Sequence, residues 1–94
     1  MRYLFLLNPT AGKRDCTVEL APAIQAAARR AGIPPEKRKV VVTQYAGHAR
    51  ELAAEAAHTA QADGEPVRIW TAGGDGTFNE ALTGAQGCSL AAVG

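Results

Sequence analysis

The residues from Thr71 to Glu80 read TAGGDGTFNE, and they follow a short apolar run that begins at Val67. Three glycines within four residues allow the backbone to approach a ligand closely and to adopt positive φ. A strand that turns through glycines into a helix directs unpaired N–H groups and a positive dipole end at one spot, which favours phosphate. Asp75 puts a carboxylate in that cradle, which is tolerable if it meets a metal ion or takes a proton from an attacking hydroxyl. The stretch therefore indicates phosphoryl transfer.

Around this turn, the chain alternates apolar runs with amphipathic segments. Continuous apolar runs are typical of strands buried on both faces of a parallel sheet. Apolar residues at three- and four-residue spacing predict helices between them. The predicted strands are 3–7, 39–43, 67–72 and 90–93, and the predicted helices are about 17–31, 49–62 and 77–83. This alternation predicts an α/β fold of three layers, in which right-handed crossovers place helices on both faces of a parallel sheet.

Two residues are expected near helix boundaries. Pro22 should lie in the first turn of its helix, or the helix should begin just before it, because proline inside a helix removes a hydrogen bond. Gly84 is expected to stop the third helix. The last strand reaches Gly94, where a further binding loop would begin, so the chain is expected to be a truncated lobe.

Composition and charge exclude several classes of protein. A net charge of +1 is too small for a nucleic-acid-binding footprint, and no apolar run approaches the length of a membrane span. The first half is locally basic, which indicates either a solvated face or a surface near phosphates or anionic lipid headgroups. Cys16 and Cys88 stand alone, without metal-binding spacing. A soluble protein of the reducing cytoplasmic compartment is expected.

The glycine turn does not match the common phosphate-binding patterns. A P-loop is excluded because no G-K-[ST] follows the glycines, and a dinucleotide fingerprint is excluded because Asn79 stands where its third glycine belongs. A purely structural turn would suit Gly73 and Gly74 without requiring the polar residues that follow. His48 could touch a phosphate, although a histidine at a helix start is more often exposed to solvent.

Three segments together resemble the diacylglycerol kinase catalytic domain family, which includes bacterial lipid kinases and sphingosine kinases. Each follows a predicted strand, and the three occur in the family's order. They are Asn8 to Gly12 (NPTAG), Thr43 to Ala49 (TQYAGHA) and Gly73 to Gly84 (GGDGTFNEALTG). They resemble the family patterns N-P-x-[SA]-G, T-x-x-x-G-[DH]-A, and G-G-D-G-T followed by N-E and a later glycine. The likeness covers nearly the whole chain.

This resemblance implies that the loops after the first three strands surround ATP. Asn8 and Gly12 would flank the phosphates, and Thr43 would offer its hydroxyl to the nucleotide. Backbone N–H groups and the Thr77 hydroxyl would hold phosphate oxygens. The implied ATP-binding set comprises Asn8, Gly12, Thr43, Gly73, Gly74, Gly76, Thr77, Asn79 and Glu80.

The catalytic role implied by the resemblance falls on Asp75. It would act through Mg²⁺, as a tentative metal contact, or on the acceptor hydroxyl, since phosphoryl transfer depends on positioning and charge neutralisation. Asn79 and Glu80 begin the following helix. For Glu80, a simple interaction with the helix dipole is the alternative interpretation.

The resemblance also concerns what lies outside these residues. Residues 1–94 would be the N-terminal, ATP-binding part of the catalytic domain, without the family's P-x-G-T-x-N-D motif and β-rich lipid-binding domain. The implied activity is transfer of the γ-phosphate of ATP to diacylglycerol or a related lipid, in phospholipid biosynthesis. The fragment alone should have little turnover, and its full-length parent could contact membranes peripherally. The alternatives are an NAD kinase-like enzyme, which shares the G-G-D-G-T turn, and a non-catalytic nucleotide-binding fragment.

Overall fold

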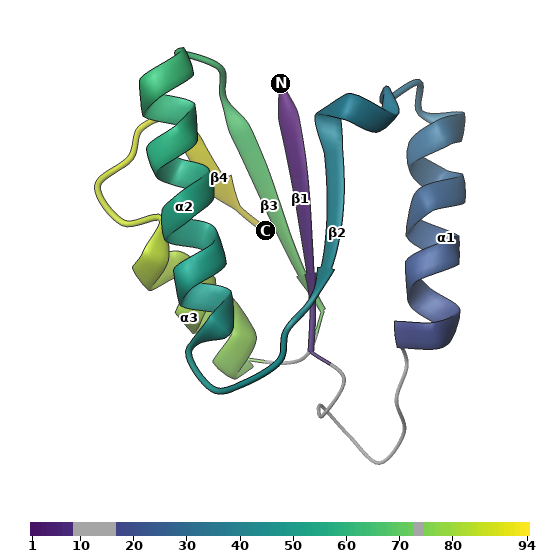
Figure 1. Cartoon of the computed structure of the whole chain (residues 1–94), viewed down its shortest axis with the longest axis horizontal. Coiled ribbons are helices and arrows are strands. Elements are labelled where there is room, and N and C mark those ends of the chain that lie inside the picture. Colours follow the sequence, from purple (N-terminus) through teal and green to yellow (C-terminus); the bar gives the residue numbers. More distant parts are fainter. Residues whose placement is uncertain (9–16, 73–74) are drawn as a thin grey trace.

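Strands and helices alternate along the chain in the computed structural model (Figure 1). It describes residues 1–8, 17–72 and 75–94, and for residues 17–20 and 75 it describes the backbone alone. The elements are β1 (Arg2–Leu7), α1 (Thr17–Arg30), the 3-10 turn η1 (Pro35–Lys37), β2 (Arg38–Val42), α2 (His48–Asp63), β3 (Val67–Ala72), α3 (Asp75–Gly84) and β4 (Ala91–Val93). The predicted strands and helices are all present, and η1 is a short element in the described ranges that the pattern did not predict.

The four strands form one parallel sheet in the order β2-β1-β3-β4. β1 occupies the interior, where Phe5 lies opposite Val40 of β2 and Trp70 of β3. An interior strand with helices on both faces has little contact with water, which explains its uninterrupted apolar sequence. The predicted α/β fold with a parallel sheet is confirmed.

The helices form two layers around the sheet. Figure 1 shows α1 on one face and α2 with α3 on the other. This division follows from the strand order, because the path from β1 to β2 runs one way across the sheet and the path from β2 through β3 to β4 runs back. Right-handed crossovers in opposite directions place their helices on opposite faces.

The main core lies between the sheet and the α2–α3 layer. Leu6 and Ile69 are completely buried there, together with Ala53, Ala60 and Ala81 from the helices. Alanine side chains let a helix approach a sheet closely, so a core with few aromatic residues can still reach the density of a protein interior. No helix in the described ranges has the length and apolar character needed to cross a membrane.

One local expectation was wrong and another was confirmed. Pro22 lies inside α1, well beyond its first residue Thr17, so this helix lacks the bond that an ordinary residue would donate to the carbonyl of Val18. Gly84 is the last residue of α3, so the helix ends where the sequence predicted. Its small size has a further use, because α3 passes very close to the backbone of α2 at this point.

Candidate nucleotide-binding site

The carboxyl ends of β1 and β3 mark the point where the chain changes direction across the sheet. β1 leads to β2 on one side, whereas β3 and β4 lie on the other side. In open α/β sheets, ligands bind in the crevice outside the strand ends at such a switch point. Asn8 follows β1, Thr43 follows β2 and α3 follows β3, so described residues of all three motif segments lie at this edge.

A cavity of about 390 Å³ opens at this edge. Four of the predicted site residues line it, namely Asn8, Thr43, Thr77 and Glu80. The remaining lining residues come from the end of β2, the following loop and the first turn of α2: Val42, Gln44, Tyr45, Ala46 and Ala49. The structure therefore brings side chains from all three motif segments to one cavity.

Asn8 joins the first motif segment to the third. Its backbone N–H donates to the carbonyl of Ala72 at 2.9 Å, which extends the β1–β3 ladder by one bond. Its side-chain Nδ2 donates to Oγ1 of Thr77 at 3.1 Å. Thr77 is only 4% exposed, and the contact is partly buried. Asn8 thus fixes the first turn of α3 against the end of β1.

Thr43 is anchored to the end of β1 in a similar way. Its N–H donates to the carbonyl of Leu7 at 2.8 Å, and its hydroxyl donates to the same oxygen at 3.3 Å. A threonine hydroxyl has one proton, so in this arrangement its oxygen faces a ligand as an acceptor. Such an oxygen suits a cation or a ligand O–H better than a phosphate oxygen.

Glu80 connects α3 to the start of α2. Its Oε2 accepts a hydrogen bond from the backbone N–H of Gly47 at 3.3 Å. Gly47 is the residue just before α2, and its φ of 89° lies in the left-handed region that glycine adopts without strain. A carboxylate here also interacts favourably with the positive end of the α2 dipole. Glu80 therefore has a structural role in addition to lining the cavity.

The loop before α2 contributes an aromatic residue, Tyr45, that the sequence did not single out. The ring of Tyr45 stacks on that of His48, with centroids 4.5 Å apart and planes 14° from parallel. His48 Nδ1 accepts the N–H of Gln44 at 2.9 Å, which holds the loop against the start of α2. The side chain of His48 is half-buried. The Tyr45 hydroxyl donates to Glu51, and this bond raises the pKa of the phenol above its usual value. The tyrosine stays protonated at neutral pH.

Two predicted residues lie in α3 but outside the cavity lining. Gly76 and Asn79 are exposed, and the Asn79 carbonyl accepts the Thr83 hydroxyl at 2.9 Å. The predicted residues Gly12, Gly73 and Gly74 lie outside the described residues, as does the side chain of Asp75. Among the side chains that are described, no cluster of three His, Cys, Asp or Glu residues could hold a metal ion.

The cavity lies between two helix starts. α2 contributes Ala49 from its first turn, and α3 contributes Thr77 and Glu80 from its first two turns. The amino-terminal ends of both helices carry partial positive charge, which favours an anion between them. Glu80 opposes this charge on one wall, so the site combines an anion-binding end with a carboxylate that suits a cation or a hydroxyl.

A comparison with known protein families finds a match over nearly the whole chain. The family description "Diacylglycerol kinase catalytic domain" matches residues 2–94. The match runs from β1 through β4 and includes all three motif segments. No curated protein matches the chain.

Proposed function

The chain belongs to the diacylglycerol kinase catalytic domain family, and on that premise we propose that it is the ATP-binding lobe of a lipid kinase. The proposed reaction transfers the γ-phosphate of ATP to a hydroxyl of diacylglycerol or a related lipid. The observation that carries the proposal is the convergence of Asn8, Thr43 and Thr77, one from each motif segment, on a single cavity. Its volume of about 390 Å³ falls within the usual range of small-molecule sites.

In this proposal, the phosphates bind at the start of α3. Backbone N–H groups of Gly73, Gly74 and Gly76 and the hydroxyl of Thr77 would hold phosphate oxygens, aided by the dipole of α3. Asn8 and Gly12 would approach the phosphates from the end of β1. The hydrogen bond from Asn8 to Thr77 supports this role, because it fixes one donor side chain beside the other.

The site residues that are not assigned to the phosphates would contact other parts of the nucleotide. Glu80 would accept a hydroxyl of the nucleotide or face the metal, and Asn79 would support the same helix turn. Thr43 would act through its oxygen, since its hydrogen atom is directed at Leu7. These assignments separate an anion-binding half of the cavity from a half that accepts hydrogen bonds or a cation.

Phosphoryl transfer requires a nucleophile, a leaving group and charge neutralisation. The lipid hydroxyl oxygen forms a bond to the γ-phosphorus, the bond to the β,γ-bridging oxygen breaks, and ADP leaves with that electron pair. Asp75 would take the hydroxyl proton or bind Mg²⁺, which supplies neutralisation of the developing phosphate charge when it is present. Its position as the first residue of α3 puts its backbone at the carboxyl edge of the sheet.

We also propose that residues 1–94 are one part of the catalytic unit. The lipid would bind to a β-rich domain of the full-length protein, which would also determine any contact with a membrane. The expectation that this chain alone has little turnover belongs to the same proposal.

Titration with Mg-ATP by calorimetry tests the nucleotide site. We expect saturable binding that Thr77→Val weakens about fivefold or more, because a hydrogen bond to a charged group is lost. Thr83→Val is the matched control, since this exposed hydroxyl is on the same helix and donates to Asn79. Absence of binding to both this chain and the full-length protein would contradict the proposal.

The acceptor is tested in the full-length protein with labelled ATP and with diacylglycerol and NAD offered side by side. Label on the lipid is the expected result. Label on NAD alone would show the NAD kinase-like alternative to be correct. Nucleotide binding without label on either acceptor would support a non-catalytic fragment.

Asp75→Asn tests the proposed catalytic residue. The substitution removes the negative charge with little change in size, so we expect turnover of the full-length protein to fall about 100-fold or more. Circular dichroism should show an unchanged fold. Glu55→Gln is the control, because Glu55 is an exposed carboxylate in the middle of α2. Activity of Asp75→Asn within a few-fold of wild type would remove Asp75 from the mechanism.

A further inference from the structure

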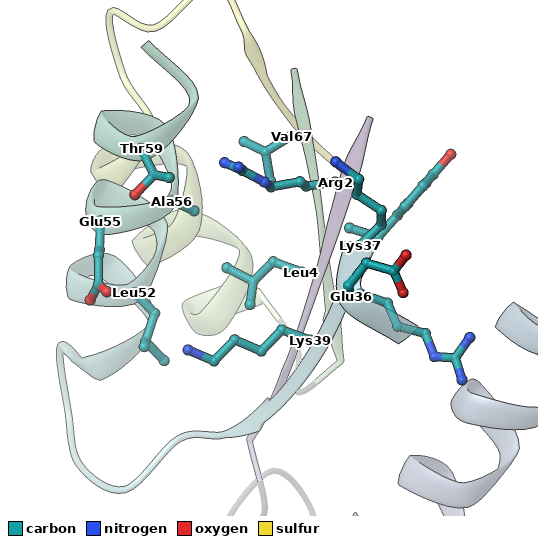
Figure 2. A pocket seen from close by; sticks show the side chains of 12 residues that line it. Arg2, Leu4, Glu36, Lys37, Lys39, Leu52, Glu55, Ala56, Thr59 and Val67 are labelled. Atoms are coloured by element: carbon teal, nitrogen blue, oxygen red, sulfur yellow. The ribbon is translucent and has the colours of Figure 1, made fainter. Parts of the chain in front are cut away.

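A second cavity, of about 250 Å³, lies between α2 and the first half of the sheet (Figure 2). It is built by the early residues of β1, β2 and β3 and by the α2 residues Leu52, Glu55, Ala56 and Thr59. In a parallel sheet, these early strand residues lie toward the edge opposite the carboxyl ends. It shares no lining residue with the cavity at the strand ends.

One part of this second cavity is apolar. Leu4 and Val67 belong to the buried core, with 6% and 5% exposure, and Leu52 and Ala56 pack against that core from α2. Figure 2 shows Leu4 extending from its strand toward α2. This surface suits a short hydrocarbon segment, because removing apolar surface from contact with water lowers the free energy.

The lining of this cavity also contains four cationic side chains: Arg2, Lys37, Arg38 and Lys39. Two of them are already engaged. Lys37 Nζ lies 3.0 and 2.9 Å from the two carboxylate oxygens of Glu65. Arg38 donates to Gln25 of α1 and to the carbonyl of Ile33, on the far side of the sheet.

Arg2 is engaged through only two of its three nitrogens. Nη2 donates to Asp63 at 2.6 Å, and Nε lies 3.1 Å from Glu65. Nη1 is buried and has no hydrogen-bond partner in the described part of the chain. Because Nη1 has almost no accessible surface, Arg2 lines the cavity without offering this donor to a ligand.

Lys39 supplies the cationic group that a ligand can reach. Figure 2 shows the side chains of Arg2 and Lys39 extending from the strands toward α2, on either side of Leu4. Within the described ranges, Lys39 forms no ion pair. Its ammonium group is therefore available to a ligand beside the same apolar surface.

We propose that this second cavity binds a small amphiphilic carboxylate. The carboxylate would accept a hydrogen bond from the exposed ammonium group of Lys39, and a short alkyl chain would cover Leu4, Leu52, Ala56 and Val67. A cavity of about 150 Å³ can hold benzene, so 250 Å³ accommodates a chain of several carbons. A monoanion fits better than a dianion, because Glu36 and Glu55 also line the cavity.

Titration of the ¹⁵N-labelled chain with octanoate, followed by NMR, tests this site. We expect saturable shifts that are confined to the lining residues. Acetate, which lacks the tail, and 1-octanol, which lacks the charge, should each bind at least about fivefold more weakly than octanoate. This design measures the contributions of the carboxylate and the alkyl chain separately.

Two variants assign the binding to the proposed contacts. Lys39→Gln removes an exposed charge without disturbing the core, and it should weaken octanoate about fivefold. Ala56→Leu fills the apolar part of the cavity and should abolish saturable binding. Arg68→Gln is the matched control, because Arg68 is an exposed cation over the Trp70 ring and does not line this cavity.

The proposal is overturned by shifts that do not saturate or that scatter outside the lining residues. It is also overturned if octanoate binds Lys39→Gln as tightly as wild type, or if 1-octanol binds as tightly as octanoate. Nucleotide binding plays no part in these readouts, so the result is independent of the proposed kinase activity.

Discussion

Glu65 forms ion pairs with three cationic groups at the edge of the sheet where the strands begin. Lys37 Nζ lies 2.9 Å from its carboxylate, Arg2 Nε lies at 3.1 Å and the amino group of Met1 at 3.2 Å. The hydrogen bond from Lys37, followed by that from the amino terminus, lowers the pKa of Glu65 below the usual carboxyl value. One side chain thus ties the start of β1 to η1 and to the turn before β3.

A lowered carboxyl pKa makes stability depend on pH in a defined direction. The stabilisation is fully present above the ordinary value of 4.5 and is lost as the pH falls through the lowered pKa of the folded state. Glu65→Gln should therefore lower Tm by a few degrees at pH 7, and the difference from wild type should disappear in acid. Thermal unfolding from pH 7 to pH 2 measures this. Glu36→Gln, a change at an exposed carboxylate in η1, is the control.

A Tm difference that stays constant across this pH range would show that Glu65 contributes through packing and not through its charge. Equal effects of the Glu65 and Glu36 substitutions at pH 7 would also contradict the assignment.

At the scale of single residues, the motifs predicted which residues would gather at the candidate site. They could not predict which of these residues contact one another. Asn8, Thr43, Thr77 and Glu80 stand at fixed places in recognisable segments, and the structure brings them to one cavity. The contact between Glu80 and Gly47 joins residues that lie 33 positions apart, so no local pattern could indicate it. Tyr45 was missed because a tyrosine in a loop has no specific spacing signal.

At the scale of helices, Gly84 controls how closely α3 approaches α2. A Cβ atom added at this position would lie 2.2 Å from the carbonyl oxygen of Arg50 and 3.0 Å from the Cβ atom of Ala53. Real Cβ atoms do not approach a backbone oxygen so closely, so the two helices would have to separate. The sequence showed a glycine at the end of a helix, but its partner helix could not be identified locally.

Gly84→Ala should destabilise the protein by about 1–3 kcal/mol, which is the usual effect of overpacking. For a chain of this length, each kcal/mol lowers Tm by roughly 4–8 °C. Gly76→Ala is the matched control in the same helix, because its added Cβ atom meets nothing within 4 Å. Calorimetry should show lower stability for the first variant only, since alanine favours an exposed helix position. Equal Tm values for both variants would contradict the close approach of the helices.

Helix boundaries were predicted less accurately than the helices themselves. α3 begins at Asp75, two residues before the predicted start, and Pro22 lies in the interior of α1 and not in its first turn. The existence and order of the helices were predictable because their apolar faces repeat over several turns.

At the scale of the whole molecule, the alternation of strands and helices predicted a parallel sheet but not its strand order. The order β2-β1-β3-β4 depends on which edge of the β1–β2 pair receives β3. That choice is made by contacts between distant segments, such as the pairing of Leu6 with Thr71. The strand order in turn creates the switch point where the three motif segments meet.

The helix α2 is a wall of both cavities. Its first turn supplies Ala49 to the cavity at the strand ends, and its middle supplies Leu52, Glu55, Ala56 and Thr59 to the second one. Between these contacts, Ala53 is completely buried against the core. A close-packed interior transmits small displacements, so a ligand that moves this helix at one cavity changes the shape of the other.

Two proposed ligands that share one helix are linked thermodynamically. If octanoate changes the affinity for Mg-ATP by some factor, Mg-ATP must change the affinity for octanoate by the same factor. Titrating each ligand in the absence and presence of the other measures this coupling, and we expect a factor of about two to ten. A factor of one would mean that α2 behaves as a fixed support. Any other value would make this alanine-rich helix an allosteric element, through which a small carboxylate could modulate nucleotide affinity without touching the nucleotide.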